Sequence, residues 1–226
     1  MKGISLHLIL YAAFYAAPPS AKGATHKLGE GVRLHAQVFY DDSFRNSSTE
    51  RNDTFMRDHF NKIFASVQAY INKMQLMINI SVANVTHNES LVVRDESGTD
   101  PLKIQPWKTL EKLREYAQDL NNSNDSIHYL FASREFYENE TQTDDLHTND
   151  TFCTGDASAT IVHTVAFNYE FYKTATKMTL LTIGLSRPSL LTEEDKKKLQ
   201  EAFRKCPKYS LKRNRREAGR RRKRGV

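Results

Sequence analysis

The sequence predicts an α/β (α+β) domain: a mixed, mostly parallel, twisted sheet of about five strands flanked by helices, with a further helix at the C-terminal end. Two observations support this class. Short apolar runs typical of strands alternate along the chain with amphipathic stretches of helical period. The chain beyond its first 23 residues is about 200 residues long, which is enough for one domain with a real hydrophobic core.

The first strand is predicted over residues 32–40, where apolar and polar side chains alternate. A helix follows, since apolar residues recur at helical spacing from a cap at Asp53 or Thr54 to about Met74. Residues 76–82 then alternate again, which indicates a strand with one buried face.

The middle of the chain contains a second strand–helix–strand pattern. Residues 91–93 predict a short strand, and residues 107–120 an amphipathic helix with Pro106 near its start. The mostly apolar residues 126–132 are typical of a buried strand. Residues 133–152 read as a polar, acidic loop.

The last part of the domain predicts a strand over residues 159–165, a helix over 171–183 and a final helix over 193–205. Thr192 followed by Asp195 approximates a capping box for the final helix. Because strands and helices alternate, the sheet is expected to be largely parallel, with one or two strands at its edge.

The two chain ends differ from the domain between them. Residues 1–23 combine a basic start, a short apolar run and small residues, which predicts a secretory signal peptide; an uncleaved anchor is the alternative. Residues 24–207 form the domain and carry a net charge of −5, whereas residues 208–226 carry ten basic residues and one Glu. The tail has no periodic apolar positions and is expected to be disordered.

Sequons and cysteines agree with secretion. Nine of the fourteen asparagines stand in Asn-x-Ser/Thr, which requires a secretory route if they are glycosylated. The nine are Asn46, Asn52, Asn79, Asn84, Asn88, Asn121, Asn124, Asn139 and Asn149. Cys153 and Cys206 are the two cysteines, and in an oxidising compartment they predict one disulfide, worth about 4 kcal/mol by loop closure.

Five stretches, in this order, carry a family resemblance: VRLHAQVFYDDSF, FNKIFASVQAYINKMQLMINISV, DSIHYLFASREF, FCTGDASATIVHT and LTEEDKKKLQEAFRKCP. Together they cover residues 32–207 and resemble the catalytic domain of reprolysin-type (adamalysin-like) zinc metalloproteases, which are metzincins. The glycosylated, degenerate relatives in tick saliva, the 28-kilodalton metastriate family, are the most similar in character. The resemblance implies a metzincin-like fold in which the helix over 171–183 corresponds to the zinc helix.

That helix departs from the family pattern A-x-x-H-E-x-G-H-x-x-G-x-x-H, in which histidines bind zinc and the Glu polarises a water. Alignment on Ala175 or on Gly184 places no His or Glu at these positions. The residues found there are Thr176, Lys177, Met178, Leu180 and Leu181. We therefore predict no catalytic residue and no metal or other cofactor, with zinc expected only if the chain has a non-standard site.

Other candidate metal ligands are weak. No two histidines after the signal peptide lie three or four residues apart, and the lone His163 reads as an ordinary strand residue. Asp144, Asp145, His147 and Asp150 form one acidic cluster, which we interpret as a solvated loop, with an accidental cation site as the alternative.

The tail predicts capture of polyanions such as heparan sulfate or anionic phospholipid, against the alternative of a solvated end without function. Its candidate binding residues are Lys212, Arg213, Arg215, Arg216, Arg220, Arg221, Arg222, Lys223 and Arg224.

The function expected from these features is that of a secreted, non-catalytic salivary protein, monomeric and without a transmembrane span. It would bind host extracellular proteins or anionic surfaces, not nucleic acid, and so modulate haemostasis or immunity. The cleft between an edge strand near residues 133–140 and the helix over 172–185 is the candidate partner surface. An active zinc metalloendopeptidase and a small-ligand binder of other ancestry remain the alternatives.

Overall fold

The computed structural model describes residues 27–48, 50, 52–94, 104–133, 137–138, 141–142, 146–164, 171–207 and 209. The predicted signal peptide, all nine candidate tail residues, Asn139, Asp144 and Asp145 lie outside the described residues. None of the helices in the described part of the chain is long and apolar enough to cross a membrane.

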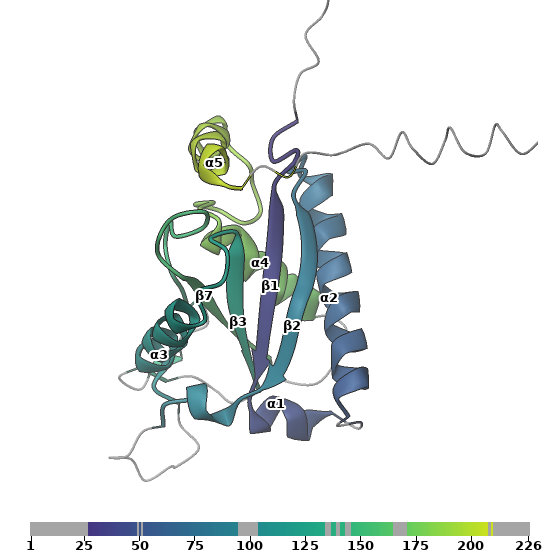
Figure 1. Cartoon of the computed structure of the whole chain (residues 1–226), viewed down its shortest axis with the longest axis vertical. Coiled ribbons are helices and arrows are strands. Elements are labelled where there is room, and N and C mark those ends of the chain that lie inside the picture. The colour runs from purple at the N-terminus through teal and green to yellow at the C-terminus, as the bar shows by residue number, and fades with distance from the viewer. Residues whose placement is uncertain are drawn as a thin grey trace, which may run out of the picture.

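A five-stranded sheet forms the centre of the fold, and it confirms the predicted class (Figure 1). Its spatial order is β2-β1-β3-β7-β6. The first four strands are parallel and β6 is antiparallel to β7. The strands are β1 (Arg33–Tyr40), β2 (Asn79–His87), β3 (Ser126–Ala132), β6 (Leu146–His147) and β7 (Ser158–His163).

Helices cover both faces of this sheet. The long helix α2 and the shorter α4 lie on one face and α3 on the other, while α5 lies beyond the amino-terminal ends of the strands (Figure 1). The helices are α1 (Asp42–Ser47), α2 (Asp53–Lys73), the short 3-10 helix η1 (Glu89–Leu91), α3 (Pro106–Asp119), α4 (Phe171–Thr182) and α5 (Glu193–Lys205). A separate hairpin pairs β4 (Tyr137–Glu138) with β5 (Thr141–Gln142).

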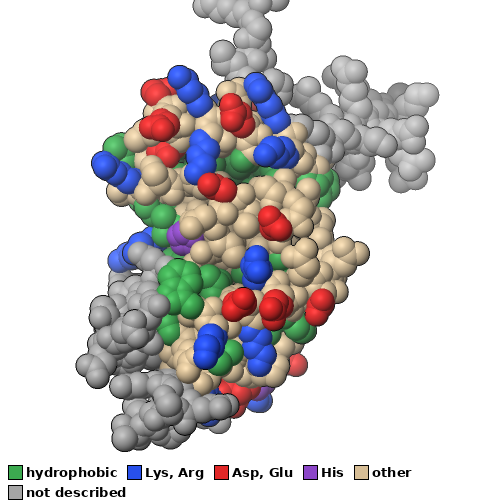
Figure 2. Space-filling model, turned by 90° about the vertical axis from the view of Figure 1, so that its left-hand side faces the viewer, with side chains coloured by type: hydrophobic (Ala, Val, Ile, Leu, Met, Phe, Trp, Pro, Cys, Tyr) green, Lys and Arg blue, Asp and Glu red, His purple; other side chains and the backbone are tan. Residues whose placement is uncertain are grey.

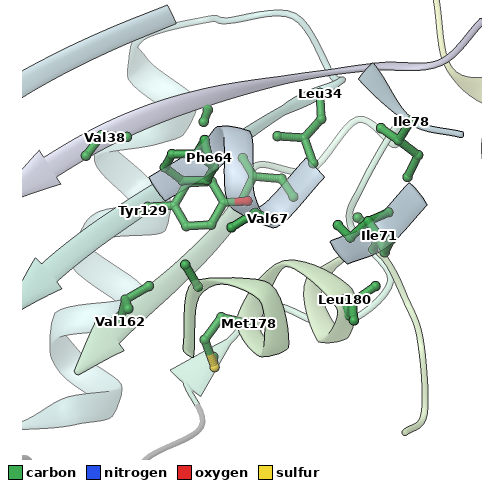
Figure 3. Packing of buried hydrophobic residues seen from close by; sticks show 14 of the residues in the cluster. Leu34, Val38, Phe64, Val67, Ile71, Ile78, Tyr129, Val162, Met178 and Leu180 are labelled. Atoms are coloured by element: carbon green, nitrogen blue, oxygen red, sulfur yellow. The ribbon is translucent and has the colours of Figure 1, made fainter. Parts of the chain in front are cut away.

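The larger core lies between the sheet and the layer of α2 and α4. In Figure 3, Phe64 and Val67 of α2 lie beside the ring of Tyr129 from β3, and Met178 of α4 belongs to the same cluster. Phe64 and Tyr129 form an edge-to-face pair with ring centroids 4.8 Å apart. The smaller core, under α3, contains Leu113 and other apolar residues of the opposite sheet face. Two apolar layers on one sheet explain why β3 is buried along its whole length.

Several predicted elements are corrected by the structure. The short strand at residues 91–93 is wrong, because the side chain of Asn88 accepts from the amide of Ser90 and starts the turn of η1. The second strand begins at Asn79 and continues to His87. The cap of α2 is Asn52, whose Oδ1 accepts from the amide of Phe55 at 2.7 Å, and not Asp53 or Thr54.

The helix start predicted from a capping motif is confirmed where side chains bond the first amides of the helix. The capping box of α5 is present, since Thr192 Oγ1 and the Asp195 carboxylate each accept from the other residue's backbone amide. Asp41 caps the six-residue α1, which the sequence did not predict. The polar segment 133–152, expected to be a loop, contributes the edge strand β6.

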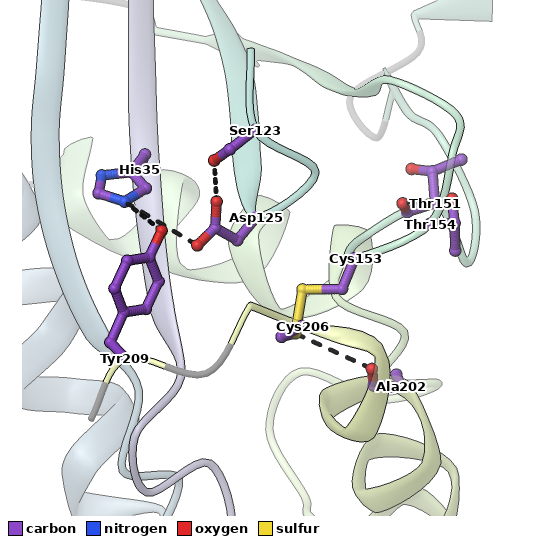
Figure 4. The surroundings of a disulfide bond; sticks show 9 residues. All are labelled: His35, Ser123, Asp125, Thr151, Cys153, Thr154, Ala202, Cys206 and Tyr209. Atoms are coloured by element: carbon purple, nitrogen blue, oxygen red, sulfur yellow. Dashed lines mark hydrogen bonds and ion pairs between the residues drawn. A yellow bond between two sulfur atoms is a disulfide. The ribbon is translucent and has the colours of Figure 1, made fainter.

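The predicted disulfide is confirmed: Cys153 and Cys206 are joined, with Cα atoms 4.8 Å apart (Figure 4). Both cysteines are buried. The bond attaches the end of α5 to the segment that precedes β7, and so holds α5 against the body of the domain.

Candidate functional site

The five residues that the family resemblance aligns with a zinc helix all lie on α4 (Phe171–Thr182), and they differ in burial. Thr176, Met178 and Leu180 are buried, Leu181 is half-buried and Lys177 is exposed. Met178 and Leu180 have no exposed surface and belong to the main core. These positions therefore serve packing, and their side chains supply neither an imidazole nor a carboxylate.

Hydroxyl groups on the buried face of α4 are satisfied inside the helix. The hydroxyls of Thr176, Thr179 and Thr182 donate to the carbonyls four residues before them, at 2.5, 2.7 and 2.8 Å. The phenol oxygen of Tyr129 lies 2.9 Å from Thr179 Oγ1. Burial raises the pKa of Tyr129 far above its usual value, so the phenol stays neutral.

A groove of about 460 Å³ lies on the outer side of α4, between this helix and α2. Its walls are mainly apolar and include Tyr70 of α2 together with Lys177 of α4. This groove is not the cleft predicted from the sequence, which was expected between α4 and an edge strand near residues 133–140. The described residues of that segment form β4, which is not part of the main sheet; the edge strand next to β7 is β6.

A polar cluster that the sequence did not predict lies at the amino-terminal ends of β1 and β3 (Figure 4). At its centre is Asp125, which is fully buried and accepts from the hydroxyl of Ser123. Tyr209, three residues after Cys206, reaches into this cluster. Its phenol oxygen lies 3.4 Å from Nε2 of His35. The guanidinium carbon of Arg33 lies 4.3 Å from the centre of the Tyr209 ring, in a cation–π contact.

The surroundings of Tyr209 keep its hydroxyl protonated. Burial and then the nearby Asp125 carboxylate raise the pKa of this phenol, and Arg33 opposes the shift. Oδ1 of Asp125 accepts from Ser123, whereas its buried Oδ2 has no hydrogen-bond partner among the described residues. We name Arg33, His35, Ser123, Asp125 and Tyr209 the tail-root cluster, because the basic tail continues from Tyr209.

Ser81 on β2 lies in series with His35 and Asp125 of the tail-root cluster, but the three do not have the geometry of a catalytic triad. Ser81 Oγ lies 3.0 Å from Nδ1 of His35, while the distance from Nε2 of His35 to the carboxylate of Asp125 is 3.9 Å. The second distance is too long for a hydrogen bond. Asp125 accepts from the hydroxyl of Ser123 instead, so it does not orient the imidazole as the aspartate of a catalytic triad does.

A second groove, of about 520 Å³, lies beside this cluster. It is formed by the first described residues, 27–32, and by Phe203, Arg204 and Tyr209. The start and the end of the described chain thus meet at the same end of the domain (Figure 1). On the face seen in Figure 2, basic and acidic side chains are interspersed, so the folded body presents no field of one sign there.

Comparison with known proteins leaves the family open. No family model matches the sequence, and no curated protein matches it. Among solved structures, the chain is similar to a zinc-dependent peptidase from Methanocorpusculum labreanum (strain Z), with 12% identity and a TM-score of 0.36. The similarity covers 77% of this chain and 94% of that chain. A TM-score of this size does not establish a shared fold.

The structure also places the other predicted site residues that it describes. Asp150 forms an ion pair with Lys198 at 2.7 Å, and His147 lies half-buried in β6. His163 is the last residue of β7, as predicted for a strand residue. Seven sequon asparagines are exposed and Asn88 is half-buried. The exposed seven are Asn46, Asn52, Asn79, Asn84, Asn121, Asn124 and Asn149.

Sequence reasoning missed the tail-root cluster because its members come from β1, from the turn before β3 and from beyond the disulfide. No spacing along the chain connects these segments. The one available signal was a tyrosine closely following the second cysteine of a predicted disulfide, just before a basic tail.

Proposed function

We propose that this protein is a secreted, non-catalytic binding protein that uses its basic tail to capture polyanionic surfaces of the heparan sulfate type. The observation that carries the proposal is that the excess positive charge lies in the tail and not in the folded domain. The tail holds ten basic residues and one Glu, and its first described residue, Tyr209, is held by contacts with Arg33 and His35 of β1. A cationic segment fixed at its root can engage a polymeric anion without any pocket.

The scaffold is proposed to be a degenerate relative of reprolysin-type metalloproteases. The sheet order, with one antiparallel strand beside β7 and a helix following β7, supports this. So does the disulfide between the segment before β7 and the end of α5. The packing of Met178 and Leu180 supports loss of catalysis, because histidines there would bury imidazoles in an apolar core.

Secretion is also part of the proposal. The leader at residues 1–23 and the basic tail at 208–226 would flank the domain at 24–207, and the disulfide and exposed sequons support an oxidising, extracellular setting. In saliva of a feeding ectoparasite, capture of host proteins or acidic surfaces would blunt haemostasis or immunity. No membrane span or nucleic-acid partner is required.

Heparin chromatography tests the tail directly. The full-length protein should be retained at moderate salt, and truncation after Pro207 should abolish retention. In a second variant the ten basic tail residues are changed to Gln and Tyr209 is kept. This variant removes the positive charge of the tail but not the contacts of Tyr209 with the domain, and it should also elute early. Equal retention of either variant would refute the tail as the binding element. Vesicles of phosphatidylserine, compared with heparin, distinguish phospholipid from glycosaminoglycan.

Elemental analysis tests the loss of catalysis. The purified protein is expected to contain no stoichiometric zinc after incubation with excess zinc and desalting, and to leave casein intact. Stoichiometric zinc together with chelator-sensitive cleavage would establish the alternative, an active metalloendopeptidase with a non-standard site.

A further inference from the structure

The sheet has one long, uncharged edge. Among the described residues β2 pairs with β1 alone, so its other side is a free edge nine residues long. A free edge exposes backbone donors and acceptors that can pair with another chain. The opposite edge strand, β6, has two residues, and a very short edge strand offers little to pair with.

The usual protection of an edge strand is missing from β2. The sequence NISVANVTH contains no Lys, Arg, Asp, Glu or Pro. Ile80, Val82 and Val85 pack against the main core, so the strand has the β-branched composition that pairs readily. Exposed along the strand are Asn79, Ser81, Ala83 and Asn84, all of them uncharged.

Two local devices close part of this edge. The amide of Ile80 donates to the side chain of Gln68 on α2, at 2.7 Å. The register with β1 shifts beyond Ala36, where Val82 and Asn84 are successive partners and Ala83 is the extra residue of a bulge. A bulge increases local twist and disfavours extension of the sheet. The remaining length of the edge has no such device.

Three sequons are spread along this strand. Asn79 is its first residue, Asn84 follows the bulge, and Asn88 comes directly after the last residue, with its amide bonded to the carbonyl of Tyr40. Asn79 and Asn84 are exposed. A glycan is bulky and hydrophilic, so three of them at these positions would screen the whole edge.

We infer that N-linked glycans on Asn79, Asn84 and Asn88 close the free edge of β2 and keep the protein monomeric. They replace the charged residues and prolines that protect edge strands elsewhere. This role is independent of the basic tail: loss of the glycans should change the state of association and leave heparin retention of the monomer unchanged.

The test begins with site occupancy of the full-length protein secreted from insect cells, measured by mass spectrometry of glycopeptides. All three sites are expected to be occupied. The edge variant N79Q/N84Q/N88Q is then compared with N46Q/N124Q/N149Q, which removes three sequons elsewhere. Sedimentation should show at least a twofold rise in mass for the edge variant at micromolar concentration, and a monomer for the control.

A rescue variant separates edge closure from a general folding role of the glycans. N79Q/N84K/N88Q carries one lysine in place of the central glycan and should return to the monomer mass, since an edge lysine blocks pairing. In the associated edge variant, amides of β2 should exchange with solvent more slowly than in the monomer. The inference would be overturned if the three asparagines carry no glycans or if the edge variant stays monomeric. It would also be overturned if the lysine variant associates, or folds as poorly as the edge variant.

Discussion

The guanidinium of Arg33 lies 4.3 Å above the ring of Tyr209, which connects the first strand of the sheet to the first residue of the tail that the structure describes. The phenol oxygen of Tyr209 lies 3.4 Å from Nε2 of His35 on the same strand. A segment otherwise defined only by its charge thus has a fixed origin at the amino-terminal end of the sheet.

Substitutions at Tyr209 should separate these two contacts. Tyr209→Ala removes both, and should lower the free energy of unfolding by about 1–2 kcal/mol, because His35 loses a hydrogen-bond partner and Arg33 an aromatic face. Tyr209→Phe keeps the ring and should lose roughly half of that amount. Urea denaturation of the full-length variants measures both, and an equal loss for Phe and Ala would show that the ring contributes nothing.

Substitutions on α4 should affect stability according to the burial of the residue that is replaced. Leu180→Ala should destabilise the fold by about 2–5 kcal/mol, because it opens a cavity between α4 and α2. The control Lys177→Ala, on the exposed side of the same helix, should change stability by less than about 0.5 kcal/mol. A large effect at Lys177 or a small one at Leu180 would contradict the packing described here.

His59 should make the fold sensitive to mild acid. Its imidazole lies among the rings of Phe44, Phe55, Phe60 and Phe171, and burial, followed by the charge of Lys62, lowers its pKa from 6.5 to about 4. The unfolded chain therefore binds the proton first, so stability present above about pH 6.5 declines as the pH falls towards 4.

The expected loss over this window is about 1–2 kcal/mol for His59, since the ring is partly exposed. His59→Phe should flatten the dependence of unfolding free energy on pH without abolishing it, because burial also lowers the pKa of His128. Identical slopes for the two proteins would exclude His59 as a source.

Asp195 should matter only in stronger acid. Hydrogen bonds from Thr192, first its hydroxyl and also its amide, lower the pKa of this carboxyl from 3.8 to about 2, with Ser186 as a further donor. Stability contributed by the carboxylate is present above about pH 4 and is lost as the pH falls through 2. Asp195→Asn should cost about 1–2 kcal/mol at neutral pH and remove this part of the acid transition, as measured by thermal unfolding.

The disulfide can be tested by mass and by stability. Intact mass with and without reduction before alkylation should show no reactive thiol in the native protein. The double variant C153S/C206S should lose about 4 kcal/mol in the loop-closure model, with α5 exchanging its amides first. Two reactive thiols in the native protein would contradict the bond.

Local chemistry made the central elements predictable. β3 and α5 have the bounds expected from the sequence, because a continuous apolar run and a capping box act within a few residues. Residues 91–93 were wrongly predicted to form a strand because hydrophobic periodicity does not reveal side-chain bonds to the backbone. The Asn88 side chain accepts from the amide of Ser90 and so favours a turn over strand pairing.

By itself, the sequence determined the fold class, the cysteine pair, the sequons and the absence of His or Glu at the positions that the resemblance aligns with a zinc helix, since each depends on residue identity or short-range periodicity. Only the tertiary structure decided that Tyr209 meets Arg33 and that three sequons share the free edge of the sheet. Those relationships join segments far apart in the chain, and the order in which parallel strands pair brings them together.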